Sequence, residues 1–194
     1  MAKPTRLAII EGSTRVQRQG ENVSKWFTNY LQQNQRFSID VIKLADMDLD
    51  PVQSQDHPRS GKYSPGVQAF ADRVGAADAF AFVTPEYNHS FPASLKHALD
   101  SCYAEWNGKA AVVVSYGGIW GGMRAAEQLR PILSGLGIAT MRDSISITAV
   151  ATHFPPDGPP VELEPVETVA SSLLVELDWW AQALAAKRAV DPYP

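Results

Sequence analysis

Short apolar segments alternate along the chain with stretches of helical spacing. Residues 6–11, 79–84 and 110–115 are almost wholly apolar, and each runs into a loop rich in glycine, proline or hydroxyl side chains. Apolar runs of this length predict buried strands of a parallel sheet. Residues 37–44 alternate and are rich in β-branched side chains, which predicts a half-buried strand. The last strand is expected over residues 144–150.

The segments between these strands predict helices, because their apolar residues recur at spacings of three and four. Ser64-Pro65 is a favourable helix start, and Cys102 falls on the inner side of the helix that follows Pro92, as core packing. Residues 45–62 and 155–165 lack a regular pattern. The final helix, 167–187, is expected to turn five side chains to the core: Val169, Leu173, Leu177, Trp180 and Leu184.

Strand and helix alternate five times, which predicts an α/β fold. We expect a single flavodoxin-like three-layer sandwich over residues 1–194, with a five-stranded parallel sheet of order 2-1-3-4-5 and helices on both faces. Ligands of such sheets lie beyond the carboxyl ends of the strands. The loops 12–20, 85–92 and 116–122 are therefore expected to form one site, and are called loops one, two and three below.

Composition narrows the classes of partner. The 194 residues carry a formal net charge of −4, so no basic face is implied and nucleic acid is not an expected partner. The apolar runs are far shorter than the roughly 20 residues of a membrane helix, so no membrane association is expected. One cysteine cannot form an intrachain disulfide, and the four histidines lack metal-ligand spacing. We predict a cytoplasmic protein without a resident metal.

Loop one favours an anion. Backbone N–H groups at a helix start bind anions, and Ser13, Arg15 and Arg18 add a hydroxyl and two guanidinium donors. The loop has neither the G-x-G-x-x-G nor the G-K-[ST] pattern, so a single phosphate monoester fits better than a dinucleotide. An ordinary strand-to-helix turn with solvated arginines is the alternative.

Loops two and three suit a flat ligand. Loop two holds an aromatic ring, an amide and hydroxyl groups between Pro85 and Pro92, which is suitable for a heteroaromatic molecule with polar edges. Four glycines let the backbone of loop three approach a ligand closely. Trp120 at the tip of loop three can stack on a ligand, cover a neighbouring subunit's site or pack on the protein's own core.

Taken together, the loops resemble those of the NADPH-dependent FMN reductase family, the flavodoxin-like quinone, azo-dye and chromate reductases. Each matching piece follows an apolar strand, and the likeness extends to the last helix, Glu176 to Leu184. The pieces are Gly12-Ser13-Thr14-Arg15 with Arg18 and Gly20, Pro85-Glu86-Tyr87-Asn88 through Pro92 and Leu95-Lys96, Tyr116-Gly117-Gly118, and Gly121-Gly122-Met123-Arg124-Ala125.

The resemblance implies bound FMN as the redox group and NADPH as the hydride donor. The residues that it places at FMN are Ser13, Arg15, Arg18, Gly20 and Glu21 of loop one, Pro85, Glu86, Tyr87 and Asn88 of loop two, and Tyr116, Gly117 and Gly118 of loop three. It places His89, Trp120 and Arg124 on the side of the substrate and NADPH. No protein acid or base is required, so no catalytic side chain is expected.

The resemblance also implies flavins, quinones or azo compounds as acceptors, bound in turn with NADPH in ping-pong kinetics. Arg18 or Arg124 would favour NADPH by pairing with its 2′-phosphate. It further implies a homodimer or tetramer, for which Trp106, Trp120 and residues 91–106 are the candidate contacts. The open side of the site, bounded by Tyr87, His89 and the Trp120 loop, is expected to be shallow and without a buried cluster of charges. A flavodoxin-like electron carrier, or a regulatory flavin-binding module, is the alternative function.

Overall fold

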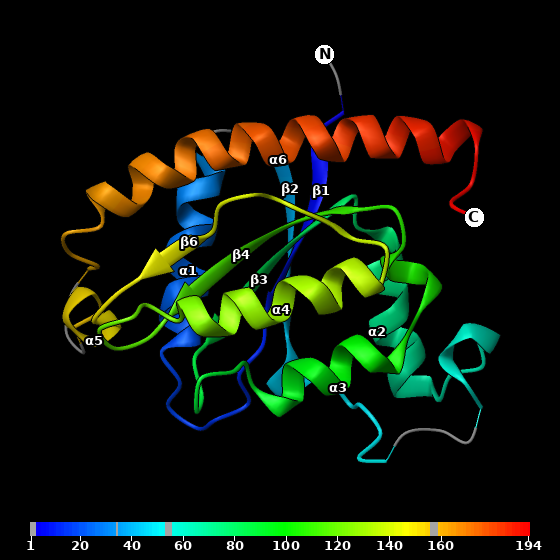
Figure 1. The fold of residues 1–194 in the computed structure, drawn as a ribbon, viewed down its shortest axis with the longest axis horizontal. Helices are drawn as coiled ribbons and strands as arrows, with labels where there is room; N and C mark the ends of the chain where they lie inside the picture. Colours follow the sequence, from blue (N-terminus) through cyan, green and yellow to red (C-terminus); the bar gives the residue numbers. More distant parts are fainter. Residues whose placement is uncertain (1–2, 34, 53–55, 156–158) are drawn as a thin grey trace.

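A parallel sheet occupies the middle of the molecule in this computed structural model, which describes residues 3–33, 35–52, 56–155 and 159–194 (Figure 1). The strand order β2-β1-β3-β4-β5 confirms the predicted topology. All pairings are parallel. The strands are β1 (Thr5–Glu11), β2 (Phe37–Lys43), β3 (Ala79–Pro85), β4 (Ala110–Tyr116), β5 (Ala139–Thr140) and β6 (Ile145–Ile147), of which β6 also pairs with β4.

The edge of the sheet differs from the prediction of one strand over residues 144–150. β5 pairs with the first two residues of β4, whereas β6 pairs with its last three. Val150 begins the short helix α5 (Val150–His153) instead of continuing the strand. The strand ends early because the backbone amides that would continue its pairing have other acceptors. The amide of Ala149 donates to the carbonyl of Gly118, and that of Val150 donates to the carbonyl of Gly117, both in loop three.

Helices form a layer on each face of the sheet, as predicted (Figure 1). α1 (Gly20–Gln32) and α6 (Glu164–Val190) pack on one face, and α2 (Pro65–Ala76), α3 (Ala93–Ser101) and α4 (Met123–Gly135) pack on the other. Each layer buries its own apolar cluster against the strands. Ser64 accepts from the amide of Val67 and caps α2, which confirms the predicted start.

The final helix presents a different face from the one that its spacing predicts. Leu173 and Leu177 are buried, but Val169 and Trp180 are 45 % and 39 % exposed, so their prediction as core residues is wrong. The buried stripe is instead completed by Ala170, Leu174 and Ala181. Small alanines let the helix approach the sheet closely along this stripe, and the bulkier Val169 and Trp180 fall on its outer margin.

Trp106 lies in the core, not at the surface. It ends the turn η3 (Ala104–Trp106) and is fully buried, so its prediction as a subunit contact is wrong. Its ring packs against Phe70, Phe80 and Phe82 at centroid distances of 5.9, 5.0 and 6.1 Å. Cys102 is also buried, and burial raises the pKa of its thiol, which confirms its assignment to core packing.

No helix in the described part of the chain is long and apolar enough to span a bilayer.

Candidate functional site

The loops that follow β1 and β3 meet at the carboxyl edge of the sheet, as predicted. The Gly12 amide donates to the carbonyl of Val83 at 2.9 Å, and the Ser94 hydroxyl donates to the carbonyl of Gly12 at 2.6 Å. Side chains also connect loops one and two, because the hydroxyls of Ser13 and Tyr87 are hydrogen-bonded at 2.7 Å. The first turn of α3, which carries Ser94, is a support that sequence patterns alone do not indicate.

Loop one has the features of an anion site. Within the described residues, Gln19 at the N-cap of α1 makes no side-chain cap hydrogen bond, so first-turn amides beyond Gly20, whose own amide bonds to the Tyr116 hydroxyl, can meet an anion. The Arg15 guanidinium lies 4.3 Å from the centroid of the Tyr87 ring, in a cation–π contact next to Ser13. Arg15 is exposed, so its charge can reach a ligand at the mouth of the loop.

Beneath loop one lies a buried ion pair that the sequence pattern does not indicate. Glu11 ends β1 and is fully buried, and the Nε of Arg18 donates to its Oε1 at 2.5 Å. Arg18 also donates to Glu21 at 2.6 Å and to the carbonyl of Arg15 at 3.2 Å. Two carboxylates therefore neutralise Arg18, which connects the first turn of α1 to the sheet.

Gly20 and Tyr116 form a close contact between loop one and β4. A Cβ at Gly20 would lie 2.7 Å from the hydroxyl oxygen of Tyr116 and 3.4 Å from Cγ of Glu11, so a larger residue does not fit. Tyr116 is buried, and burial raises the pKa of its hydroxyl, which stays protonated at neutral pH. The close approach to Gly20 shows that this hydroxyl points toward loop one.

Loop two ends in a tight, strained turn. Tyr87 and Ser90 exchange two backbone hydrogen bonds of 2.7 and 3.0 Å. Between them, Asn88 and His89 both have positive φ angles, 51° and 68°. Such angles at two successive residues other than glycine cost energy and tend to occur at functional sites. The turn places exposed Asn88 and His89 at the edge of the site.

An ion pair connects loop two to the helix that follows loop three. Arg124, in the first turn of α4, donates to Glu86 through its guanidinium at 2.8 Å and through its amide at 3.2 Å. Its guanidinium also lies 4.9 Å from the Trp120 ring, which is 57 % exposed. Arg18 and Arg124 are the residues predicted to pair with the 2′-phosphate of NADPH, but both are already paired with carboxylates of the chain. Either arginine would have to release a carboxylate in order to bind this phosphate.

Loop three depends on residues 145–150, for which the sequence predicts a strand but not the bonds to the loop. The Gly117 amide donates to the carbonyl of Ile147, and both Gly117 and Gly118 accept from the start of α5. Ala149 has a φ of 44°, a conformation that alanine rarely adopts. The backbone of β6 and α5 therefore holds Gly117 and Gly118 in place.

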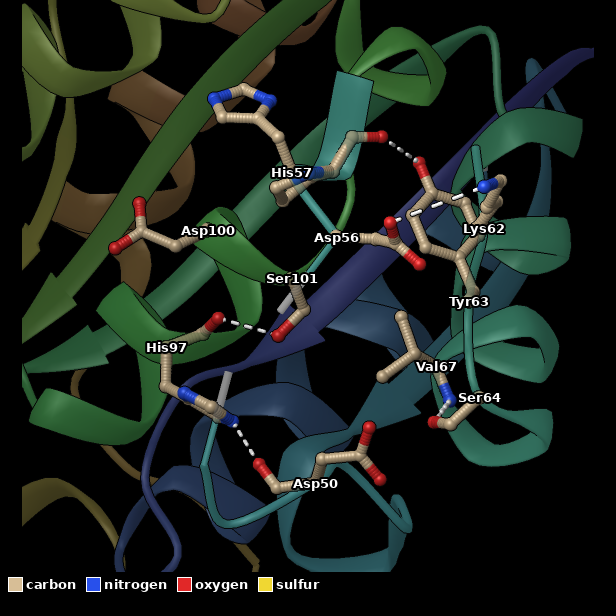
Figure 2. Close-up of a pocket in the computed structure, with 11 residues that line it drawn as sticks. Asp50, Asp56, His57, Lys62, Tyr63, Ser64, Val67, His97, Asp100 and Ser101 are labelled. Atoms are coloured by element: carbon tan, nitrogen blue, oxygen red, sulfur yellow. Dashed lines mark hydrogen bonds and ion pairs between the residues drawn. The ribbon is translucent and has the colours of Figure 1, made fainter. Parts of the chain in front are cut away.

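A concavity lies away from the three loops, between α3 and the region that joins β2 to α2 (Figure 2). It has a volume of about 230 Å³. One ring nitrogen of His97 donates to the carbonyl of Asp50 at 2.7 Å, and the Tyr63 hydroxyl donates to the carbonyl of Pro58 at 3.1 Å. Within the described residues, no group of three or more His, Cys, Asp or Glu side chains is placed to hold a metal. The bond of His97 attaches the predicted irregular excursion, of which 53–55 lie outside the described residues, to α3, whereas that of Tyr63 stays within the connection between β2 and α2.

Comparison with known proteins identifies the family. Residues 5–152 match the family model described as NADPH-dependent FMN reductase. The chain belongs to this family. It is 34 % identical over 155 residues to an NAD(P)H-dependent FMN reductase of Schizosaccharomyces pombe, covering 78 % of this chain and 74 % of the relative. It is also 34 % identical over 143 residues to one of Saccharomyces cerevisiae, covering 68 % and 74 %.

Solved structures share the fold of this FMN reductase family member. The flavoenzyme NAD(P)H:(acceptor) oxidoreductase FerB of Paracoccus denitrificans has a TM-score of 0.66 at 22 % identity, covering 94 % of this chain and 98 % of that one. An archaeal flavodoxin has a TM-score of 0.56 at 12 % identity, covering 92 % and 99 %. The flavodoxin-like fold and the family resemblance drawn from the three loops are thus confirmed, and the chain is an oxidoreductase by family.

Proposed function

We propose that this family member binds FMN at loops one to three and passes electrons from NAD(P)H to flavin, quinone or azo-type acceptors. The observation that carries the proposal is loop one: α1 lacks a side-chain cap, and Arg15 stands on Tyr87 beside the Ser13 hydroxyl. These groups suit a doubly charged phosphate monoester. The names of the fungal relatives, which are FMN reductases, support the same cofactor.

The residues present fit FMN better than FAD, because only one anion site is formed by the loops described. Ser13, Arg15 and the amides near Gly20 and Glu21 would hold the phosphate. The ribityl chain and the ring would lie between the two other loops, whose contact residues are Pro85, Glu86, Tyr87 and Asn88 on one side and Tyr116, Gly117 and Gly118 on the other. The absence of a side chain at Gly20 lets loop one lie directly against the Tyr116 hydroxyl of β4.

When bound, FMN supplies the hydride chemistry, and the chain supplies position and access. The Glu86–Arg124 ion pair keeps loops two and three at a constant separation. His89 and Trp120 are exposed at the open side, where a flat donor or acceptor can stack. A shared open side requires the donor to leave before the acceptor binds. Broad acceptor choice follows from stacking, since few directed hydrogen bonds are available there.

Arg15→Ala is expected to weaken FMN binding by about 1.5–3 kcal/mol, or roughly 10- to 150-fold, because a charge-assisted contact to the phosphate is lost. Fluorescence titration of the apoprotein measures this change. Arg142→Ala is the matched control, because Arg142 is 87 % exposed on the segment between β5 and β6. Equal FMN affinity in wild type and Arg15→Ala would show that the phosphate binds elsewhere.

One experiment distinguishes a flavin-dependent reductase from an electron carrier that does not react with NADPH. The purified protein should be yellow, and NADPH added without oxygen should bleach its visible absorbance within the mixing time. A yellow protein that stays oxidised would support the electron carrier instead, and a colourless protein that FMN cannot reconstitute would contradict both. With donor and acceptor both varied, we expect parallel double-reciprocal lines, whereas intersecting lines would indicate a ternary complex.

Other expectations from the sequence stay predictions. They are a cytoplasmic location, the absence of nucleic-acid and membrane partners, and assembly into a homodimer or tetramer. With Trp106 in the core, Trp120 is the remaining tryptophan contact of those predicted. Its exposed ring lies at the mouth of the site, where a second subunit would complete a pocket for the donor and acceptor.

A further inference from the structure

Arg18 contacts three parts of the chain at once. Its Nε donates to Glu11 at the end of β1 at 2.5 Å, and its two terminal nitrogens donate to the carbonyl of Arg15 at 3.2 Å and to Glu21 at 2.6 Å. Arg15 lies in the middle of loop one, and Glu21 lies in the first turn of α1. A planar guanidinium can hold several acceptors in a single fixed geometry. These three contacts are called the Arg18 clamp below.

Stability alone does not explain why the Arg18 clamp is built on Glu11. The Glu11 side chain is fully buried, and its Oε2 has no hydrogen-bond partner within the described residues. A buried carboxylate with an unpaired oxygen is costly, and an apolar pair of similar size is often at least as stable. A buried polar group in this state therefore calls for another explanation, which the path of loop one provides.

Loop one follows a strained path between Arg15 and Arg18. Gln17 has a φ of 56°, in the left-handed region that residues other than glycine rarely adopt. Strain of this kind persists only where the surroundings impose it. The backbone of Arg15 is held at both of its polar groups, because its amide donates to the Ser13 hydroxyl at 3.4 Å and its carbonyl accepts from Arg18. The Arg18 clamp thus stabilises a loop conformation that the local sequence disfavours.

We propose that Glu11 and Arg18 are positioning residues, which hold loop one ready for the FMN phosphate and thereby set the preference of the site for FMN over riboflavin. This inference rests on the proposed function. Riboflavin has the same ring and ribityl chain but no phosphate. Arg15, which is exposed beside the Tyr87 ring, would meet the phosphate, and Arg18 acts through its contact with the Arg15 carbonyl. A loop that is already in place binds its ligand without the cost of ordering it.

The surroundings of Arg18 argue against a direct contact with the phosphate. Its side chain is only 10 % exposed, and its charge is shared between two carboxylates, Glu11 and Glu21. Release of Glu11 would leave that buried carboxylate without any partner, which is strongly unfavourable. In the described part of the chain, the guanidinium of Arg15 contacts the Tyr87 ring and forms no ion pair, so its charge stays available to an anion.

The first test compares the affinities of the apoprotein for FMN and for riboflavin, measured by fluorescence titration. Arg18→Lys keeps the positive charge, but one ammonium group cannot hold three separated acceptors, so FMN binding should weaken roughly tenfold. Riboflavin binding should stay close to that of wild type, because loops two and three are not altered. An FMN affinity equal to that of wild type would overturn the proposal. Equal losses for both flavins would also overturn it, since they would indicate a general loosening of the protein.

Arg73→Lys is the matched control. Arg73 of α2 likewise bridges a carboxylate and a backbone carbonyl, because it donates to Asp40 at 2.5 and 3.0 Å and to the carbonyl of Val41 at 2.8 Å. It lies outside loops one to three. The ratio of the FMN and riboflavin affinities should therefore equal the wild-type ratio in this variant. A ratio lowered as far as in Arg18→Lys would contradict a role specific to loop one.

The double variant Glu11→Met/Arg18→Met tests the positioning role apart from stability. It removes both buried ions together and is therefore expected to fold. We expect it to lose FMN affinity at least as strongly as Arg18→Lys, while its riboflavin affinity stays near that of wild type. A folded double variant with the full preference for FMN would show that neither ion positions loop one.

A double-mutant cycle with Arg15→Ala separates positioning from direct contact. If Arg18 acts through Arg15, the variant Arg15→Ala/Arg18→Lys should bind FMN about as weakly as Arg15→Ala alone. Losses that simply add would mean that Arg18 meets the phosphate itself, against the proposal. Wild type that binds FMN no better than riboflavin would overturn the proposed phosphate site as well, whereas a wild-type preference that survives in Arg18→Lys overturns the positioning role alone.

Discussion

Arg18→Met is expected to lower the free energy of unfolding by roughly 3–5 kcal/mol, because it leaves the carboxylate of Glu11 buried without its partner. Glu11 is fully buried, and its Oε2 already has no hydrogen-bond partner within the described residues. The Arg18 guanidinium therefore provides the main compensation for this charge, through the contact of 2.5 Å. Urea unfolding followed by circular dichroism measures the change.

The double variant Glu11→Met/Arg18→Met separates the lost pair from lost packing. Replacing both ions by apolar side chains of similar length is often close to neutral, so most of the stability should return. Arg142→Met is the surface control and should leave the unfolding midpoint unchanged, because Arg142 and Asp143 are both exposed. A single variant as stable as wild type would show that Glu11 is not charged in the folded protein.

Trp106→Ala is expected to cost roughly 3–5 kcal/mol of unfolding free energy, as for other large aromatic side chains truncated in a core. The ring touches Phe70, Phe80 and Phe82, so its removal leaves a cavity between α2 and the sheet. The same urea titration measures this change. The m-value, which is the slope of the unfolding free energy against urea concentration, should stay the same if the folded and unfolded states keep their compactness.

Trp179→Ala is the matched control for Trp106→Ala, because it removes the same side chain from an exposed position. In the monomer it should change stability by no more than about 0.5 kcal/mol. If Trp106→Ala instead changed the mass in solution and left the unfolding free energy intact, Trp106 would be an interface residue and its place in the core would be wrong.

Local pattern was sufficient for the architecture of this protein. The segments that form β1, β3 and β4 are apolar at nearly every position, so both faces of each strand can be buried. Because crossovers between parallel strands are right-handed, only a few orders of such strands are possible. The carboxyl ends of parallel strands lie at one edge of the sheet, so loops one, two and three could be placed together before any contact was known.

Long-range packing decided which side chains face the core and which charges are paired. The spacing of α6 is compatible with a stripe through Val169 and Trp180 or one through Ala170 and Ala181. Only the close approach of the helix to the sheet selects the alanines. Trp106 likewise has no helical or strand period around it, and the rings of Phe80 and Phe82 determine its burial.

Some features of the candidate site can likewise be predicted from the sequence, and others depend on the tertiary structure. Its loops and the residue types of an anion site follow from the sequence, because glycine, hydroxyl and arginine side chains at a strand-to-helix turn have a local meaning. The buried Glu11–Arg18 pair and the link from Glu86 to Arg124 do not, since pairing depends on distance in space and on the desolvation of each ion. The sequence thus determined the strand order and the edge of the sheet at which the three loops meet, whereas only the tertiary structure decided which charges of these loops are paired within the chain.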